Sequence, residues 1–225
     1  MKITEVIVPA AGQGVRFAGA VPKPLVLLKG KPILVYSLEI FERCSLVEGI
    51  IVVAPEALRT DFEKVIGQYR LKKVKAIVPG GRTRRESVSH GLKAVSPATE
   101  FVVVHDAARP LTTLKLVEEA LTVCYRESAV IAAVPVKPTI KRVNPQDRTV
   151  EATLDRDLLW EVQTPQVFAR DILVKAHEAG RGIEATDDAA LVERLGVKVT
   201  VVMGDYRNIK VTTPEDLKIA EALLD

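Results

Sequence analysis

A glycine-containing segment near the N-terminus carries residues suited to holding phosphate groups. It reads Pro-Ala-Ala-Gly-Gln-Gly-Val-Arg over residues 9–16 and follows an apolar run, Val6–Val8, that predicts a buried strand. Its small residues are Ala10, Ala11, Gly12 and Gly14, and its cations are Arg16 and the nearby Lys23. Small residues let backbone N–H groups approach phosphate oxygens, and the cations complement their charge. The segment predicts a polyphosphate site, although a turn that needs only glycine fits the same residues.

The two common glycine-rich phosphate motifs are absent here. A dinucleotide-binding Gly-x-Gly-x-x-Gly motif would need glycine where Phe17 stands, and no Gly-Lys-Ser or Gly-Lys-Thr of a P-loop follows. A dinucleotide-dependent oxidoreductase is therefore a disfavoured alternative.

A second signal lies in the segment Val-His-Asp-Ala-Ala-Arg-Pro over residues 104–110. The apolar run Phe101–Val104 predicts a strand that delivers Asp106 to its carboxyl end. A carboxylate beside a polyphosphate is suited to holding Mg²⁺, with other ligands from phosphate and water. Arg109 could form a structural ion pair or contact a phosphate, and we expect the structural role. We also expect His105 to be a structural residue.

Two further segments offer contacts to a nucleotide. Gly80 and Gly81 precede a predicted helix and would let the backbone approach a nucleobase edge, which displays its own donor and acceptor pattern. Ser87 could bond a base or a phosphate, or belong to a helix cap. Lys210 stands between Ile209 and Val211 on a predicted short strand and faces either solvent or the cleft.

Residues in the C-terminal half suit a phosphorylated polyol. Arg156 offers a bidentate grip on a phosphomonoester. Thr164 and Thr186 offer hydroxyl groups, and Trp160 is expected in the core.

The elements that must position these residues are alternating strands and helices. The apolar strand-like runs are Val6–Val8, Ile50–Ala54, Ala76–Val78, Phe101–Val104, Ala129–Val134 and Val197–Val202. Helix starts are predicted at Thr213-Pro214 and at 186–188, the latter helix ending before Gly196. This order predicts an α/β, Rossmann-like fold: a mostly parallel sheet with helices on both faces. Ligands of such sheets bind beyond the carboxyl ends of the strands, so the candidate residues should share one cleft.

Residues 137–155 break this pattern and predict a protruding β-hairpin arm. The segment is polar, turns at 144–147, and returns with alternating Val150, Ala152 and Leu154. Because a lone hairpin of this composition is barely stable, we expect the arm to contact a second subunit in a homodimer, with a flexible surface excursion as the alternative. The chain length predicts a single domain spanning residues 1–225, from which the arm protrudes.

The composition of the chain limits the kinds of partner that it is expected to bind. The chain has 225 residues and a net charge of +3, too mild to indicate nucleic acid, and its 4% aromatic content offers little base stacking. No apolar run is long enough to span a membrane, and no signal peptide is expected. Cys44 and Cys124 have no metal-ligand spacing and should pack as small apolar groups. We expect a cytoplasmic protein.

Taken together, these motifs resemble the 2-C-methyl-D-erythritol 4-phosphate cytidylyltransferases of the non-mevalonate isoprenoid pathway. The resemblance covers almost the whole chain, residues 8–224. It rests on Pro-Ala-Ala-Gly-x-Gly-x-Arg at 9–16, Pro-Lys at 22–23, Gly-Gly-x-x-Arg-x-x-Ser-Val at 80–88, Val-His-Asp-Ala-Ala-Arg-Pro at 104–110, Asp-Arg-x-x-Leu-Trp at 155–160, Gln-Thr-Pro-Gln at 163–166, Thr-Asp-Asp-Ala at 186–189 and Asn-Ile-Lys-Val-Thr at 208–212.

The resemblance implies a role for each residue. Arg16, Lys23 and Lys210 would contact the phosphates of CTP and the charge that develops during transfer. Asp106 would hold Mg²⁺, and the glycine segment around Gly80 and Gly81, with Ser87, would recognise cytosine. Thr139 and Arg156 of a partner's arm would bind methylerythritol phosphate near Thr164 and Thr186. The nearest alternative is a ribitol 5-phosphate cytidylyltransferase, and a non-catalytic nucleotide sensor is a third.

Overall fold

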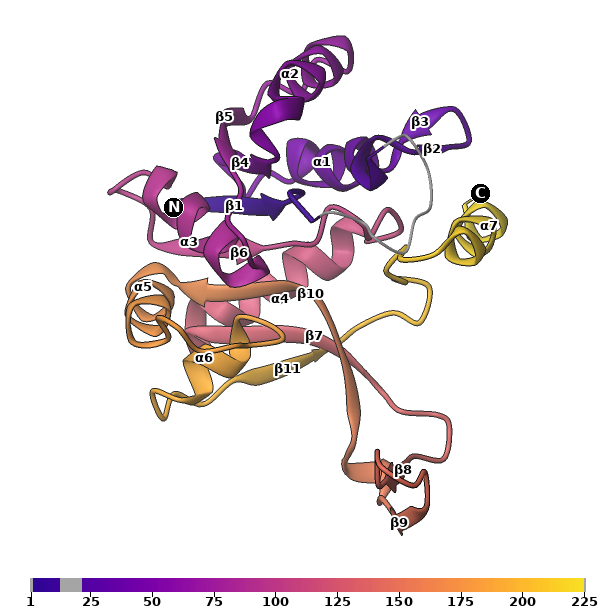
Figure 1. Ribbon diagram of the computed structural model, residues 1–225. Coiled ribbons are helices and arrows are strands. Elements are labelled where there is room, and N and C mark those ends of the chain that lie inside the picture. The colour runs from indigo at the N-terminus through magenta and orange to yellow at the C-terminus, as the bar shows by residue number, and fades with distance from the viewer. Residues whose placement is uncertain (1, 13–21, 225) are drawn as a thin grey trace.

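The computed structural model describes residues 2–12 and 22–224, which form a seven-stranded central sheet (Figure 1). The strands are β1 (Thr4–Pro9), β4 (Gly49–Ala54), β5 (Val74–Pro79), β6 (Phe101–Val104), β7 (Ala129–Pro135), β10 (Trp160–Ala169) and β11 (Thr200–Met203). Their order is β11-β7-β10-β6-β1-β4-β5. β10 is antiparallel to β6 and β7, and the other adjacent pairs are parallel. The predicted Rossmann-like, mostly parallel sheet is confirmed.

Helices cover both faces of this sheet because its central strands are apolar on both sides. Ile7 packs in one hydrophobic cluster while its neighbours Val6 and Val8 pack in the other, as side chains alternate along a strand. One face is covered by α1 (Ile33–Arg43), α2 (Arg59–Gln68) and α4 (Leu114–Glu127), the other by α3 (Arg84–Ala94), α5 (Arg170–Ala179) and α6 (Ala189–Glu193). Cys44 and Cys124 are buried in the cluster that contains Val6 and Val8, as predicted.

A third, smaller hydrophobic cluster joins two ends of the chain. It places α7 (Pro214–Leu223) against the hairpin of β2 (Leu27–Leu28) and β3 (Lys31–Pro32). Its fully buried members are Leu28, Ile33, Val211 and Ala220. The predicted helix start at Thr213 is confirmed, because its side chain forms a capping box with Asp216.

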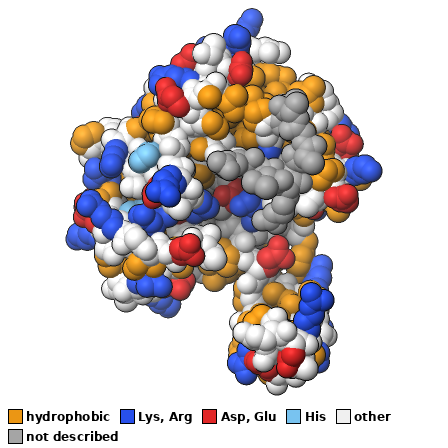
Figure 2. Space-filling model, viewed as in Figure 1, with side chains coloured by type: hydrophobic (Ala, Val, Ile, Leu, Met, Phe, Trp, Pro, Cys, Tyr) orange, Lys and Arg blue, Asp and Glu red, His pale blue; other side chains and the backbone are white. Residues whose placement is uncertain are grey.

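The predicted arm is present as a hairpin of β8 (Lys141–Val143) and β9 (Val150–Thr153) that projects away from the body of the molecule (Figures 1 and 2). The chain enters it from β7 and leaves it through a short 3-10 helix, η3 (Arg156–Leu158), into β10. Val143 and Val150 are 43% and 59% exposed, so the hairpin has no core of its own.

The structure corrects several details of the predicted elements. Trp160 is 40% exposed rather than in the core, because β10 begins at the base of the arm, where the strand has not yet reached the packed part of the sheet. Lys210 lies in an irregular segment, not on a strand. The helix expected to reach Leu195 ends at Glu193, and Gly196 follows with φ +75°, the left-handed conformation that a chain reversal after a helix requires.

Candidate active site

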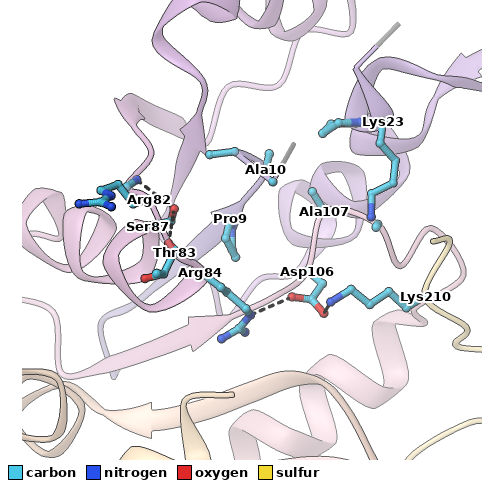
Figure 3. Close-up of a pocket in the computed structure, with 15 residues that line it drawn as sticks. Pro9, Ala10, Lys23, Arg82, Thr83, Arg84, Ser87, Asp106, Ala107 and Lys210 are labelled. Carbon is cyan, nitrogen blue, oxygen red and sulfur yellow. Dashed lines mark hydrogen bonds and ion pairs between the residues drawn. The ribbon is translucent and has the colours of Figure 1, made fainter. Parts of the chain in front are cut away.

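A cleft of about 380 Å³ opens beyond the carboxyl ends of β1, β5 and β6 (Figure 3). Loops after these strands supply most of its walls. Of the predicted site residues it is lined by Ala10, Ala11, Gly12, Lys23, Gly81, Ser87, Asp106 and Lys210. Gly14 and Arg16 lie outside the described residues. Segments distant in sequence thus meet in one cleft, and the cationic groups come from η1 (Lys23–Leu25), from α3 and from the segment before α7.

Asp106 lies at the floor of this cleft between two cations. Lys210 Nζ is 2.8 Å from Oδ2 of Asp106, and Arg84 Nε is 3.4 Å from Oδ1. Figure 3 shows the two cationic side chains pointing at the carboxylate from opposite sides. Arg109 is a third cation near this carboxylate, with Nε 3.7 Å from Oδ2.

This surrounding charge keeps Asp106 ionised. Burial alone would raise the pKa of its carboxyl group, but the neighbouring Arg84, Lys210 and Arg109 hold that pKa well below its usual range. The carboxylate is therefore a fixed negative charge at neutral pH, and the cations around it keep the cleft attractive to an anion.

A second cavity, of about 400 Å³, adjoins the first and shares three of its residues: Arg84, Asp106 and Lys210. Thr164 and Thr186 line this second cavity, as does Arg109. The shared residues form a boundary, so a group bound in either cavity would meet the same cations. This arrangement suits a reaction between two anionic substrates.

The segment predicted to recognise the nucleobase, around Gly80 and Gly81, is held by close contacts within the protein. A side chain at Gly80 would come within 2.2 Å of Ala11 Cβ, so glycine is required there by the close approach of the first loop. The backbone N–H of Gly81 donates to Ser87 Oγ at 3.1 Å, and that hydroxyl donates to Thr83 O at 3.0 Å. Ser87 therefore shapes the loop, while Gly81 faces the cleft.

The arm residues do not join the site of their own chain. Thr139 and Arg156 are exposed, and neither lines the two cavities described above. Arg156 donates to Lys137 O at 3.1 Å across the base of the arm. Any role in binding substrate would have to be played at another subunit's site.

Sequence reasoning missed Arg84, which lines both cavities. Besides its contact with Asp106, its Nη1 lies 2.6 Å from Oδ2 of Asp188, a carboxylate that is 1% exposed. Asp188 is held in turn by His177 Nε2 at 2.9 Å. Burial disfavours the charged guanidinium, yet the two carboxylates raise the pKa of Arg84 above its ordinary value. The arginine of the Gly-Gly-x-x-Arg motif was the available signal.

His105 and Arg109 make structural contacts, and Arg109 also lines the second cavity. Both side chains are buried, and Nδ1 of His105 is 3.0 Å from Thr164 Oγ1. The Thr164 hydroxyl also accepts the backbone N–H of Asp106 at 3.1 Å. Arg109 donates to Asn208 O at 2.7 Å. These contacts support the loop that carries Asp106.

A magnesium ion would find one protein ligand in this cleft. No group of three or more His, Cys, Asp or Glu side chains within residues 2–12 and 22–224 is arranged to hold a metal. Asp106 nevertheless fits Mg²⁺, which is commonly held by one or two carboxylates together with substrate phosphates and water. Its ionised oxygens face the cleft in which a polyphosphate would lie.

Comparison with known proteins identifies the family. The family model of 2-C-methyl-D-erythritol 4-phosphate cytidylyltransferase, abbreviated IspD, matches residues 4–225. The chain belongs to the IspD family. It is 47% identical over 227 residues to the protein of that name from Alkaliphilus metalliredigens, covering 100% of this chain and 93% of the relative. A similar relative from Geobacillus kaustophilus is 44% identical and covers 98% and 96%.

Solved structures of IspD proteins share the same fold. A 4-diphosphocytidyl-2C-methyl-D-erythritol synthase from Anaerococcus prevotii gives a TM-score of 0.87 at 32% identity and covers 99% of this chain and 96% of that one. The cytidylyltransferase from Thermus thermophilus gives 0.81 at 33% identity, covering 99% and 98%. The predicted resemblance is confirmed, and the chain is an enzyme of the nucleotidyltransferase class.

Proposed function

We propose that the enzyme transfers a cytidylyl group from CTP to 2-C-methyl-D-erythritol 4-phosphate and releases pyrophosphate. The observation that carries this proposal is the pair of adjoining cavities divided by Arg84, Asp106 and Lys210. Two substrates on either side of that boundary would place an attacking phosphate next to the phosphate under attack. The names of the relatives support this choice of substrates.

The nucleotide belongs in the first cavity. Ala10, Ala11 and Gly12 present small residues after β1, and Lys23 faces them across the cleft. Arg16 would add a further cation to the triphosphate. Gly81, with Gly80 and Ser87 behind it, would read cytosine through backbone groups.

The polyol phosphate belongs in the second cavity. Thr186 is exposed there and can offer its hydroxyl, whereas the Thr164 hydroxyl is occupied by Asp106 N and His105. Thr164 therefore contributes to the shape of this cavity more than to hydrogen bonding with the polyol phosphate. Arg109 and Lys210 supply positive charge along the same wall.

The chemistry needs no general base. The second pKa of a phosphate monoester is about 6, so the acceptor is already anionic at neutral pH. An oxygen of that phosphate attacks the α-phosphorus of CTP in line, a P–O bond to pyrophosphate breaks, and the electron pair leaves with pyrophosphate. Lys23, Arg84 and Lys210 reduce the repulsion between the two anions and stabilise the charge that develops.

We also propose that Asp106 holds Mg²⁺ in the loaded enzyme. When bound, the ion would withdraw charge from phosphate oxygens as a Lewis acid. Lys210, which pairs with Asp106 in the structure, would then be available to the phosphates.

A homodimer would complete the acceptor site. Exposed apolar side chains follow the arm and its base: Val143, Val150, Leu158 and Trp160. Their burial against a second copy would stabilise the hairpin and bring Thr139 and Arg156 to the partner's second cavity. We propose that this dimer works in the cytoplasm. Among the described residues no helix has the length and apolar character to cross a bilayer.

The test is a pyrophosphate-release assay with Mg²⁺ that crosses four nucleoside triphosphates with two acceptors. CTP with methylerythritol 4-phosphate should give turnover well above every other pairing. Preference for ribitol 5-phosphate would replace the acceptor. Protection against thermal unfolding by NAD but not by CTP would reject the proposal in favour of a dinucleotide-dependent oxidoreductase.

A further inference from the structure

The segment that carries Lys210 has no regular structure of its own. It runs from β11 to α7 without strand or helix hydrogen bonds, yet it delivers Lys210 Nζ to within 2.8 Å of Asp106. A lysine has several rotatable bonds, so a fixed backbone is needed to keep its ammonium group at the boundary between the cavities. The contacts that fix this backbone converge on Asn208, two residues before Lys210.

Asn208 is fully buried, and the polar atoms of its side chain all have partners. Its amide nitrogen donates to Thr164 O at 3.0 Å and to Gln163 Oε1 at 3.1 Å. Its side-chain oxygen accepts from Thr112 Oγ1 at 2.7 Å. Its backbone carbonyl accepts from Arg109 Nη1, also at 2.7 Å.

These partners belong to the segments that build the active site. Arg109 and Thr112 follow Asp106 in the loop after β6, and Gln163 and Thr164 lie where β10 passes the second cavity. On the other side of Lys210, Val211 N donates to Ala108 O at 2.8 Å. The Lys210 backbone is thus tied to the Asp106 loop both before and after the lysine.

We propose that Asn208 is a positioning residue that sets Lys210 relative to Asp106 and Thr164. The inference rests on the proposed function, because it assigns Lys210 to the transferred phosphate. A buried polar side chain whose atoms all have partners, as those of Asn208 do, holds the segments that it joins rigidly. A displacement of a reacting or stabilising group by about 1 Å can lower turnover roughly a hundredfold. Asn208 therefore acts through Lys210 without touching substrate.

The main test is Asn208→Asp, which keeps the size of the side chain. The carboxylate retains the acceptor for Thr112 but directs an oxygen at Thr164 O and Gln163 Oε1, where a donor is needed. We expect kcat to fall roughly a hundredfold, with KM for CTP changed less than about threefold. In the Lys210→Ala background the same change should lower kcat by less than about threefold, because the positioned group is already gone.

A milder variant and a matched control keep the proposal testable if Asn208→Asp does not fold. Thr112→Val removes the hydroxyl that donates to Asn208 and should lower kcat about tenfold, again only when Lys210 is present. Thr4→Val removes another buried hydroxyl, which bonds Tyr125 Oη at 3.0 Å at the amino end of β1, away from the cleft, and should leave kcat within about twofold.

The outcomes separate the two proposals. The role of Asn208 would be overturned if its substitution lowered kcat by the same factor with and without Lys210. An unchanged kcat in both Asn208→Asp and Thr112→Val would overturn it too. Either result would leave the proposal of cytidylyl transfer intact. If Asn208→Asp does not fold, the cycle between Thr112→Val and Lys210→Ala decides. An inactive wild-type enzyme would reject the proposed function and this role with it.

Discussion

Lys23 and Lys210 reach one cleft from different elements, and the other cations that line it among the described residues are Arg82 and Arg84. We predict that Lys23→Ala and Lys210→Ala each lower turnover about a hundredfold or more, because each removes a preorganised charge from the transition state. Pyrophosphate release measures the loss, and thermal unfolding checks the fold. Lys64→Ala, at a lysine on α2 whose side chain is 74% exposed, is the matched control. Undiminished turnover in either cleft variant would remove that lysine from the site.

His105 predicts a pH dependence of stability. Its side chain is fully buried, and burial lowers its pKa to about 3 from an ordinary value of 6.5. Between these pH values the unfolded chain binds a proton that the folded protein does not, so folding becomes less favourable as pH falls below 6.5. From pH 6.5 to 5 this residue should cost about 2 kcal/mol of the free energy of unfolding.

The measurement is urea unfolding of wild type and His105→Gln at both pH values. Glutamine does not titrate, so the variant should lose about 2 kcal/mol less than wild type over this interval, whatever its stability at pH 6.5. Parallel losses in the two proteins would show that His105 does not titrate in this way.

The residues most easily predicted from sequence were those in loops directly after apolar strands. Asp106 follows an uninterrupted apolar run, so its position at a carboxyl end could be read from the chain. Arg84 could not be placed in this way. It stands in the first turn of a helix, where an arginine is ordinarily solvated, and its partner Asp188 comes from an element more than a hundred positions away. Only the fold, which brings the start of α3 to the residue before α6, reveals the pair.

Among the elements, β10 escaped prediction because its middle is polar. Gln163, Thr164 and Gln166 interrupt the apolar pattern, yet all three are buried. The register of β10 with β7 shifts between Val162 and Gln166 at this point, and Gln163, Thr164 and Gln166 line the second cavity. A strand that builds a polar site cannot also display an apolar periodicity, so its sequence looks like a loop.

Helix α7 gives a prediction at the same scale. The third cluster contains Val26, three residues after Lys23, and Ile209 and Val211 on either side of Lys210. Leu217→Ala on α7 should loosen this packing at a cost of about 2 kcal/mol and lower turnover several-fold. Ile219→Ala, at a position 50% exposed on the same helix, should do neither. Measured kcat and melting temperatures for the pair check this, and equal kcat values would show that α7 does not support the lysines.

At the scale of the whole molecule, the arm was predicted as a hairpin, but its partner could not be read from one chain. We predict that Arg156→Ala and Lys210→Ala, which should each have low activity alone, complement each other when co-expressed. In a mixed dimer, one site would combine an intact Lys210 with an intact Arg156 from the other subunit's arm. Random pairing should then restore roughly a quarter of wild-type activity.

The control for this experiment is a mixture of Lys23→Ala with Lys210→Ala. If both lysines of a site come from the same chain, each site of a mixed dimer would still lack one lysine. An intact site could form only if the two lysines of a site came from different chains. Because Figure 3 shows both lysines reaching the cleft of a single chain, this mixture should stay inactive. Restoration there, or none with Arg156→Ala, would contradict an arm that serves the partner.

Because β10 runs antiparallel to β7, the arm between these two strands can change in length without disturbing the sheet. β7 and β10 touch along their length, with Trp160 opposite Pro135, so the excursion between them leaves and re-enters the sheet at one point. Insertions or deletions at its tip, residues 144–147, would leave the register of every sheet strand unaltered. We expect relatives to differ in the length of this tip far more than in the residues of the first cavity. Acceptor preference and subunit pairing could then change during evolution without a change in the nucleotide site.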